Sequence, residues 1–115
     1  MFNFENLRVY KDSLEYIDHV YKITKTWSSN ERFGLTDQLR RASSSVALNI
    51  AEGTSRTKKD FGHFLDLARG SCYECVSVLQ IALGQKYISQ QDYSSLYDEL
   101  EMISRKLSAL KRSLQ

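Results

Sequence analysis

The residues of this chain that could do chemistry are concentrated in and after one segment, QLRRASSSVALNIAEGTSR, which spans residues 38–56. Apolar positions at helical spacing run through the segment, and polar or charged side chains interrupt them repeatedly. A cluster of cations can bind the phosphates of a nucleic acid. Six basic residues form such a candidate nucleic-acid contact: Arg40, Arg41, Arg56, Lys58, Lys59 and Arg69.

The alternative for these polar groups is a network that holds helices or subunits in register. Buried polar groups must be hydrogen-bonded, and an arginine paired with a carboxylate fixes one register across an interface. In such a network Arg41 or Arg56 pairs with a glutamate, and an asparagine bonds the backbone of a neighbouring helix. The candidates beside the arginines are Gln38, Asn49, Glu52, Ser71 and Glu74. A second basic group, Arg105, Lys106, Lys111 and Arg112, is expected to be a solvated face that also suits the C-terminal end of a helix.

Other chemistries have little support. Cys72 and Cys75 have the C-x-x-C spacing of a redox pair or half a metal site, but they fall in the middle of an expected helix, on its core face. A redox pair needs a helix N-terminus, where the dipole lowers the thiol pKa, so we expect core packing. Glu15 and His19 offer the only local pairing similar to a bundle metal motif, on the solvent side of their helix. We therefore expect no metal, no cofactor and, without a visible nucleophile or phosphate loop, no enzyme.

The composition describes one modest domain. The chain has 115 residues, is 42% hydrophobic and carries a formal net charge of +2. That charge is far from the strongly basic balance of an obligate nucleic-acid binder, so any basic surface must be local. No apolar run approaches the roughly 18 residues of a membrane span, and the first residues lack an apolar signal segment. We expect a cytoplasmic protein without membrane contact.

Four amphipathic segments predict four helices, at about residues 4–27, 35–54, 58–86 and 90–114. Thr57 with Asp60, and Ser89 with Asp92, resemble capping boxes that open the last two. The first helix has an apolar line that we expect to face the core: Leu7, Tyr10, Leu14, Ile17 and Tyr21. Short connections between long helices, and the absence of proline, predict an all-α antiparallel up-down-up-down four-helix bundle that forms one domain over residues 1–115.

The first and third helices each carry a second apolar line. Gly62 and Gly70 also lie inside the third helix, where glycine is disfavoured and suggests the close approach of another backbone. A wide core with scattered surface residues would explain the second lines; our preferred interpretation is a subunit interface in a closed oligomer. The expected oligomer seam is Val9, Tyr16, Val20, Ile23, Trp27, Leu67, Val78 and Ile81.

Three blocks of the chain resemble a known family. FENLRVYKDSLEYIDHVYKIT, FGLTDQLRRASSSVALNIAEG and SRTKKDFGHFLDLARGSCYE, in that order, closely resemble the bacterial four-helix-bundle proteins encoded in intervening sequences of 23S ribosomal RNA genes. The resemblance implies a ring-shaped homopentamer without established catalytic activity or cofactor. The family is also similar to the accessory variability protein of diversity-generating retroelements, which supports nucleic-acid binding by analogy alone.

From these observations we expect a non-enzymatic, homo-oligomeric scaffold or adaptor, a homopentamer by resemblance. Its partners would be further copies of itself and structured RNA or a nucleic-acid-processing enzyme, contacted through the basic residues. The alternative is a protein-binding assembly factor with no role in nucleic-acid chemistry.

Overall fold

Four long helices make up most of the chain. The computed structural model describes residues 1–31 and 34–115. The helices are α1 (Arg8–Thr24), α2 (Leu35–Gly53), α3 (Lys58–Gly84) and α4 (Gln90–Ser113), and two short 3₁₀ helices, η1 (Asn3–Asn6) and η2 (Ser29–Glu31), precede α1 and α2. The expected all-α fold with four helices is therefore confirmed.

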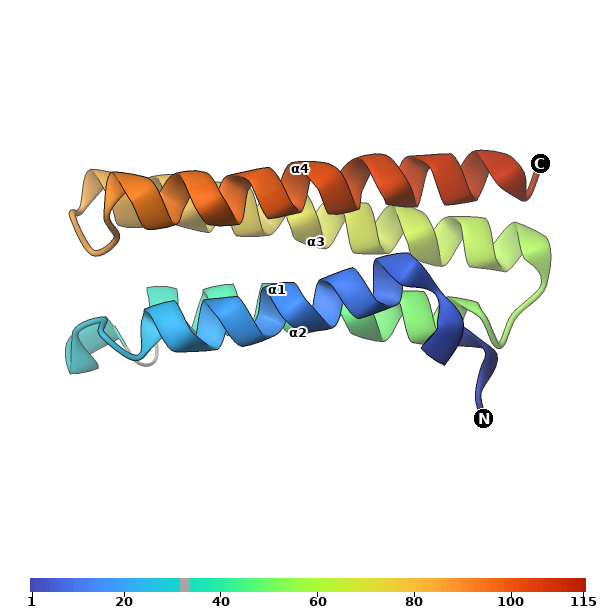
Figure 1. Ribbon diagram of the computed structural model, residues 1–115, viewed down its shortest axis with the longest axis horizontal. Helices are drawn as coiled ribbons and strands as arrows, with labels where there is room; N and C mark the ends of the chain where they lie inside the picture. The colour runs from blue at the N-terminus through green and yellow to red at the C-terminus, as the bar shows by residue number, and fades with distance from the viewer. Residues whose placement is uncertain (32–33) are drawn as a thin grey trace.

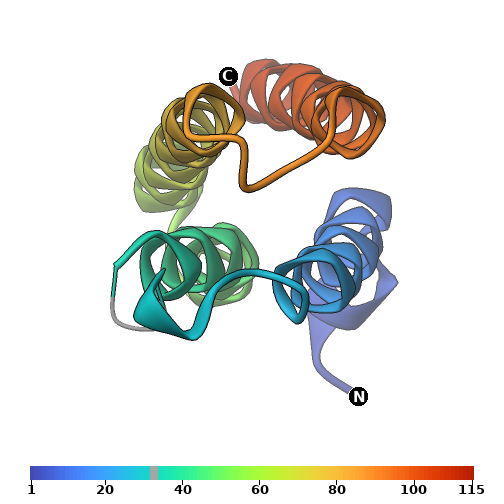
Figure 2. The ribbon, with the colours of Figure 1, turned by 90° about the vertical axis from the view of Figure 1, so that its left-hand side faces the viewer.

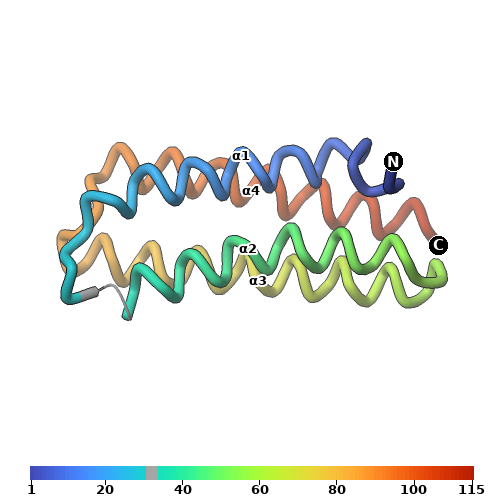
Figure 3. The backbone as a smooth tube through the Cα atoms, turned by 90° about the horizontal axis from the view of Figure 1, so that it is seen from below, coloured from blue at the N-terminus to red at the C-terminus, as the bar shows by residue number. Residues whose placement is uncertain are grey.

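The helices lie side by side in a body of 42 × 22 × 19 Å. α1 packs against α2 and α4, and α3 packs against α2 and α4, so that the four axes surround one core (Figure 2). The α2–α3 turn and both termini lie at one end of the bundle, and the other two connections lie at the opposite end (Figures 1 and 3). Side chains from residues 53–66 and from the last turns of α4 therefore come together at one end.

The helix ends follow local signals in the chain. The side chains of Thr57 and Ser89 cap α3 and α4 by accepting hydrogen bonds from the backbone N–H groups of Asp60 and Asp92, at 3.3 and 3.0 Å, as predicted. α1 begins four residues later than predicted, because residues 3–6 form η1 and the extended backbone of Leu7 separates η1 from α1.

Gly53 is the last residue of α2, as predicted. The close packing of α3 explains why this residue is a glycine. A Cβ atom at this position would lie 2.8 Å from the Cδ1 atom of Phe61 and 2.8 Å from the Cβ atom of Phe64. Both phenylalanines belong to α3, and carbon atoms pack at about 3.5–4.0 Å. The missing side chain thus lets α3 turn back closely against the end of α2.

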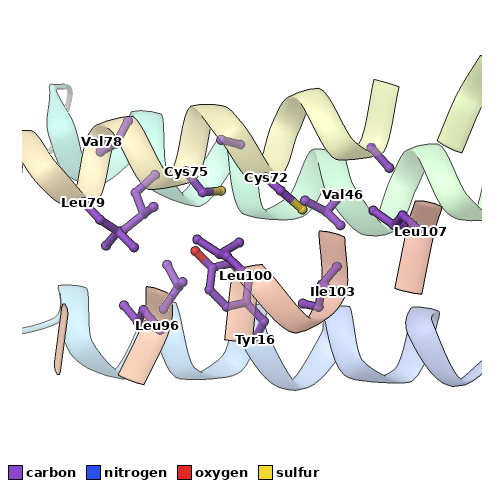
Figure 4. Close-up of a cluster of buried hydrophobic side chains, with 14 of the residues drawn as sticks. Tyr16, Val46, Cys72, Cys75, Val78, Leu79, Leu96, Leu100, Ile103 and Leu107 are labelled. Atoms are coloured by element: carbon purple, nitrogen blue, oxygen red, sulfur yellow. The ribbon is translucent and has the colours of Figure 1, made fainter. Parts of the chain in front are cut away.

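The core is a continuous apolar cluster to which all four helices contribute (Figure 4). On α2, α3 and α4, the apolar side of each predicted amphipathic helix faces this core, as expected. Their fully buried residues include Leu39, Val46, Ile50, Leu65, Leu79, Leu96, Leu100, Ile103 and Leu107.

On α1 the predicted core face is wrong. Tyr16 and Val20 are completely buried, whereas Leu14 and Tyr21 of the expected core line are 46% and 40% exposed. The two apolar lines lie about a third of a turn apart, and the positions of α2 and α4 decide which one is enclosed.

The expected oligomer seam must be corrected accordingly. Val9, Tyr16, Val20, Trp27 and Val78 belong to the core of a single chain, and a side chain buried there cannot also face a second subunit. Ile23 is half-buried and packs against this core. Only Leu67 and Ile81, which are 43% and 50% exposed, remain available for contacts between subunits.

Candidate nucleic-acid interface

The six predicted nucleic-acid contacts do not form one patch. Arg40 and Arg41 lie near the start of α2, whereas Arg56, Lys58 and Lys59 lie at the α2–α3 turn, at the opposite end of the bundle (Figure 3). A helical rise of about 1.5 Å per residue puts some 20 Å between the two groups. Arg69 lies farther along α3, three turns beyond the basic residues that open this helix.

Arg40 and Arg41 serve the packing and the surface of α2. The Nε atom of Arg40 donates a hydrogen bond to the hydroxyl oxygen of Thr24 at 3.0 Å, and its guanidinium lies 4.5 Å from the centre of the Tyr21 ring. Arg40 therefore ties α2 to α1. The side chain of Arg41 is 79% exposed and pairs with Asp37 of the same helix at 2.9 Å, so it makes no inter-helix network.

The other basic residues assemble at the end of the bundle that carries the α2–α3 turn. The C-terminal turn of α4 adds two cations there, because the Nζ atom of Lys111 bonds Asp66 of α3 at 2.6 Å and the stem of Lys111 lies beside Gly62. We call this surface the basic end and define it as Arg56, Lys58, Lys59, Lys111 and Arg112. Three carboxylates lie at the same end: Glu52 pairs with Arg56 at 3.2 Å, Asp66 pairs with Lys111, and Asp60 stands in the first turn of α3.

Helix stability does not explain the two lysines of the basic end. Lys58 and Lys59 are the first two residues of α3. The N-terminus of a helix carries a partial positive charge, so cations there are disfavoured by about 0.3–1 kcal/mol each. Lys111 and Arg112 differ, because they stand in the last turn of α4, where the dipole favours them. The lysines therefore suit an anion brought to the same helix N-terminus from outside.

A second basic surface lies between α3 and α4, which run side by side (Figures 1 and 2). Here a groove of about 630 Å³ is lined by Arg69, Arg105 and Arg112, and by the acidic residue Glu101. Arg112 belongs to both surfaces. The sequence alone did not predict that Arg69 lies near Arg105 and Arg112, because these arginines belong to a different helix and are 36 or more positions away.

The predicted polar network is smaller than expected and centres on Ser45. The side-chain amide of Asn49 donates to the carbonyl and hydroxyl oxygens of Ser45 on its own helix, at 2.9 and 3.0 Å, instead of to a neighbouring backbone. The hydroxyl of Ser71 donates to the Ser45 hydroxyl oxygen at 2.9 Å and joins α3 to α2. Gln38 and Glu74 are exposed, and their side chains make no hydrogen bond or ion pair within the described residues.

One buried charge was not predicted as a site. Asp12 is 4% exposed, and its carboxylate bonds the Nζ atom of Lys106 at 2.6 Å and the Nε atom of Arg8 at 2.9 Å. Asp12 stands one turn from Tyr16, on the apolar line of α1 that is enclosed, which is the signal that could have revealed it. Lys106 therefore belongs to an ion pair between α1 and α4 and not to the solvated face that we expected.

His19 also finds a partner across the bundle. Its Nδ1 atom lies 2.6 Å from a carboxylate oxygen of Glu99 on α4, whereas Glu15 lies 3.7 Å from Arg8. Within residues 1–31 and 34–115, no three metal-ligating side chains gather into a site. Over the same residues, no helix has the length and apolar character that a membrane span requires.

Cys72 and Cys75 are free thiols in the core, as predicted. Burial raises the pKa of Cys72 to about 12 and that of Cys75 to about 11. Both sulfurs are consequently protonated at neutral pH, and the thiolate is the reactive form. The Tyr16 hydroxyl lies close to Cys75, and burial raises its pKa well above 10. These groups pack the core and offer no nucleophile.

Comparison with known proteins assigns the chain to a family. Residues 5–109 match the model of the 23S rRNA-intervening sequence protein family. No curated protein matches the chain. A protein of unknown function from the S23 ribosomal protein family of Bacteroides thetaiotaomicron has the same fold, with a TM-score of 0.83 and 23% identity over 90% of this chain and 95% of that one. The chain therefore belongs to the 23S rRNA-intervening sequence protein family.

Proposed function

We propose that this chain is a non-enzymatic, cytoplasmic, homo-oligomeric scaffold or adaptor that contacts structured RNA through its basic end. The observation that carries the proposal is the pair of lysines at the N-terminus of α3, where the helix dipole disfavours them. A phosphate placed there meets both lysine charges and the N–H groups of Lys58 and Lys59, whereas the N–H group of Asp60 already bonds Thr57. Arg56 from the α2–α3 turn, and Lys111 and Arg112 from α4, extend the same surface.

The basic residues are arranged for phosphates and not for reading bases. Lys58 and Lys59 are exposed and have no ion pair in the described part of the chain, so they are free to displace the counterions of an RNA backbone. Each phosphate neutralised makes the slope of log affinity against log salt concentration more negative by about 0.9 for a duplex. Three or four contacts from the basic end therefore predict a slope of about −3 for one chain.

Self-assembly is the second part of the proposal, and we propose a homopentamer. Leu48 of α2 is 67% exposed and Leu67 of α3 is 43% exposed, on helices that pack against each other. Leu48 stands one turn from Ser45 and Leu67 one turn from Ser71, the two serines that join α2 to α3, so the leucines are near each other and support a contact with a second copy. Native mass spectrometry should show five subunits, and Leu48→Lys with Leu67→Lys should release smaller species. Leu14→Lys is the control, because Leu14 is 46% exposed on α1 and belongs to neither helix.

The RNA contact is tested by fluorescence anisotropy of a labelled RNA hairpin titrated with protein across a salt series. The double variant Lys58→Gln/Lys59→Gln should weaken binding and flatten the slope by about 2. Lys22→Gln/Lys25→Gln removes the same charge from two exposed lysines of the opposite end of the bundle and should change much less. Equal effects of the two double variants, or no binding at low salt, would refute the contact.

A protein-binding assembly factor is the alternative, and the exposed leucines favour it equally. The two functions predict different effects of salt on binding. Affinity for RNA should fall as the salt concentration rises, because counterions compete for the phosphates, whereas docking of a polypeptide on exposed leucines should depend little on salt. If RNA binding is absent while Leu48 and Leu67 remain accessible in the assembled protein, these leucines are the docking surface for another polypeptide. Hydrogen exchange of residues 44–52 and 64–71 in the oligomer measures this accessibility.

A further inference from the structure

The α3–α4 groove combines three kinds of surface that the basic end lacks. Its cations are Arg69, Arg105 and Arg112, and apolar side chains also line it. Two aromatic residues contribute to the lining, Tyr73 from α3 and Tyr97 from α4. A volume of about 630 Å³ is within the range of sites for small organic ligands, roughly 300–1,000 Å³.

The charge of the groove is positive and poorly neutralised. Its one lining carboxylate, Glu101, is 3.9 Å from Arg105, and both side chains are more than half exposed. Such a pair contributes little, because water screens it. Arg69 and Arg112 have no carboxylate partner in the described part of the chain. Three arginines therefore line the groove together with a single, weakly paired carboxylate.

Hydrogen-bond donors in the groove are also unused. The Nε atom of Arg69 is shielded from solvent and has no partner among the described residues, although another nitrogen of its guanidinium donates to the Tyr73 hydroxyl at 3.4 Å. The hydroxyls of Ser104 and Ser108 line the groove and make no hydrogen bond within the same residues. A buried donor normally has a partner, so the Nε atom of Arg69, with the half-buried serines beside it, suits a ligand with several acceptor oxygens.

The aromatic rings favour one class of anion. Tyr73 is 65% exposed, an unusual amount for a large aromatic ring, and the Arg69 guanidinium lies 5.7 Å from its centre. Tyr97 packs beside Tyr93, with ring centres 5.8 Å apart. Bases of single-stranded nucleic acids stack on such rings while cations hold the phosphates. The bases of a blunt duplex are stacked inside and cannot do so.

We propose that the α3–α4 groove binds an unpaired nucleotide of an RNA strand, with its base against Tyr73 and its phosphate on Arg69 and Arg105. Val76 and Leu100 supply the apolar lining for the sugar and base. This inference rests on the proposed RNA contact and adds to it, because the basic end holds paired RNA by its phosphates and the groove selects a strand with a free end or a loop.

The test compares a blunt RNA duplex with the same duplex carrying a four-nucleotide unpaired tail. Anisotropy titrations at one salt concentration should show the tailed RNA bound about tenfold more tightly. A 2-aminopurine base in the tail should lose fluorescence on binding as it stacks. Equal affinities without quenching would overturn the inference while leaving the RNA contact of the basic end intact, and absence of all binding would overturn both.

Two pairs of variants assign the effect to the groove. Tyr73→Leu should remove the preference for the tail and the quenching, whereas Tyr73→Phe, which keeps the ring, should retain both. Arg105→Gln should weaken tail binding about tenfold. Arg41→Gln is its matched control, because Arg41 is equally exposed and pairs with a carboxylate four residues earlier, at the other end of the bundle.

Two further outcomes would overturn the assignment. A tail preference that survives both Tyr73→Leu and Arg105→Gln would place the unpaired nucleotide elsewhere. Displacement of the tail by hexaglutamate as effective as by a short single-stranded RNA of the same charge would assign the groove to acidic peptides.

Discussion

The carboxylate of Asp12 links the first and last helices of the bundle, and its removal is the sharpest test of the structure. Asp12 bonds Lys106 at 2.6 Å and Arg8 at 2.9 Å, while its own side chain is 3% exposed. We expect Asp12→Ala to lower the free energy of unfolding by about 2–4 kcal/mol. For a chain of this length the total is of order 6–17 kcal/mol, so the loss is large.

The magnitude follows from the exposure of the two partners. A hydrogen bond to a charged group contributes roughly 1.5–3 kcal/mol when it is protected from water. The bond to Lys106 belongs to this class, since the lysine side chain is 39% exposed and covers the carboxylate. Arg8 is 65% exposed, so its pair with Asp12 contributes about 0–1 kcal/mol. In the variant Lys106 can still reach water, which keeps the loss below that of a fully buried pair.

Urea unfolding followed by circular dichroism, at one protein concentration, measures the change. Asp37→Ala is the matched control, because Asp37 pairs with Arg41 at 2.9 Å but is 40% exposed; it should cost at most about 1 kcal/mol. A double-mutant cycle with Lys106→Met isolates the pair and should give a coupling energy of about 1–2 kcal/mol. If Asp12→Ala destabilises no more than Asp37→Ala, the ion pair contributes nothing and the reasoning fails.

Four further predictions concern the glycines and the core thiols. Gly53→Ala should destabilise the fold by about 1–3 kcal/mol, because its Cβ atom would lie 2.8 Å from two phenylalanine side chains. Gly70→Ala, whose Cβ atom would meet nothing within 4 Å, should stabilise it by about 0.5–1 kcal/mol, and melting temperatures in the reverse order would contradict both. Because the pKa values of Cys72 and Cys75 are raised from 9.0 to about 12 and 11, the unfolded state loses these protons first, so the free energy of unfolding should fall between pH 9 and pH 11. Replacing both cysteines by alanine should flatten that fall, and an unchanged slope would exclude them as its cause. In the native protein at pH 8 neither thiol should react with a disulfide reagent, whereas both should do so in urea.

The placement of the helices was predictable because its signals are local. Leu96, Leu100, Ile103 and Leu107 repeat at three and four residues, and all of them are buried. Thr57 and Ser89 cap the helices they were predicted to open. Each of these signals acts over fewer than about five residues, so the chain carries them whatever surrounds it.

The inner face of α1 was not predictable in the same way. Tyr16 and Leu14 both belong to apolar lines with helical spacing, and nothing within the helix distinguishes them. A charged residue, Asp12, also lies on the enclosed face, and its partner Lys106 is 94 positions away in the sequence. Only the packing of α2 and α4 around α1 could decide.

The sequence by itself determined four helices, most of their ends, three of their four core faces and the inert position of the two cysteines, because the spacing of side chains along one helix is sufficient for each. The tertiary structure decided which basic side chains share a surface. It separated Arg40 and Arg41 from the basic end and brought Arg69 beside Arg105 in the α3–α4 groove. The physical reason is that a helix fixes the direction of each side chain relative to its own axis, whereas a shared site depends on how two axes lie against each other.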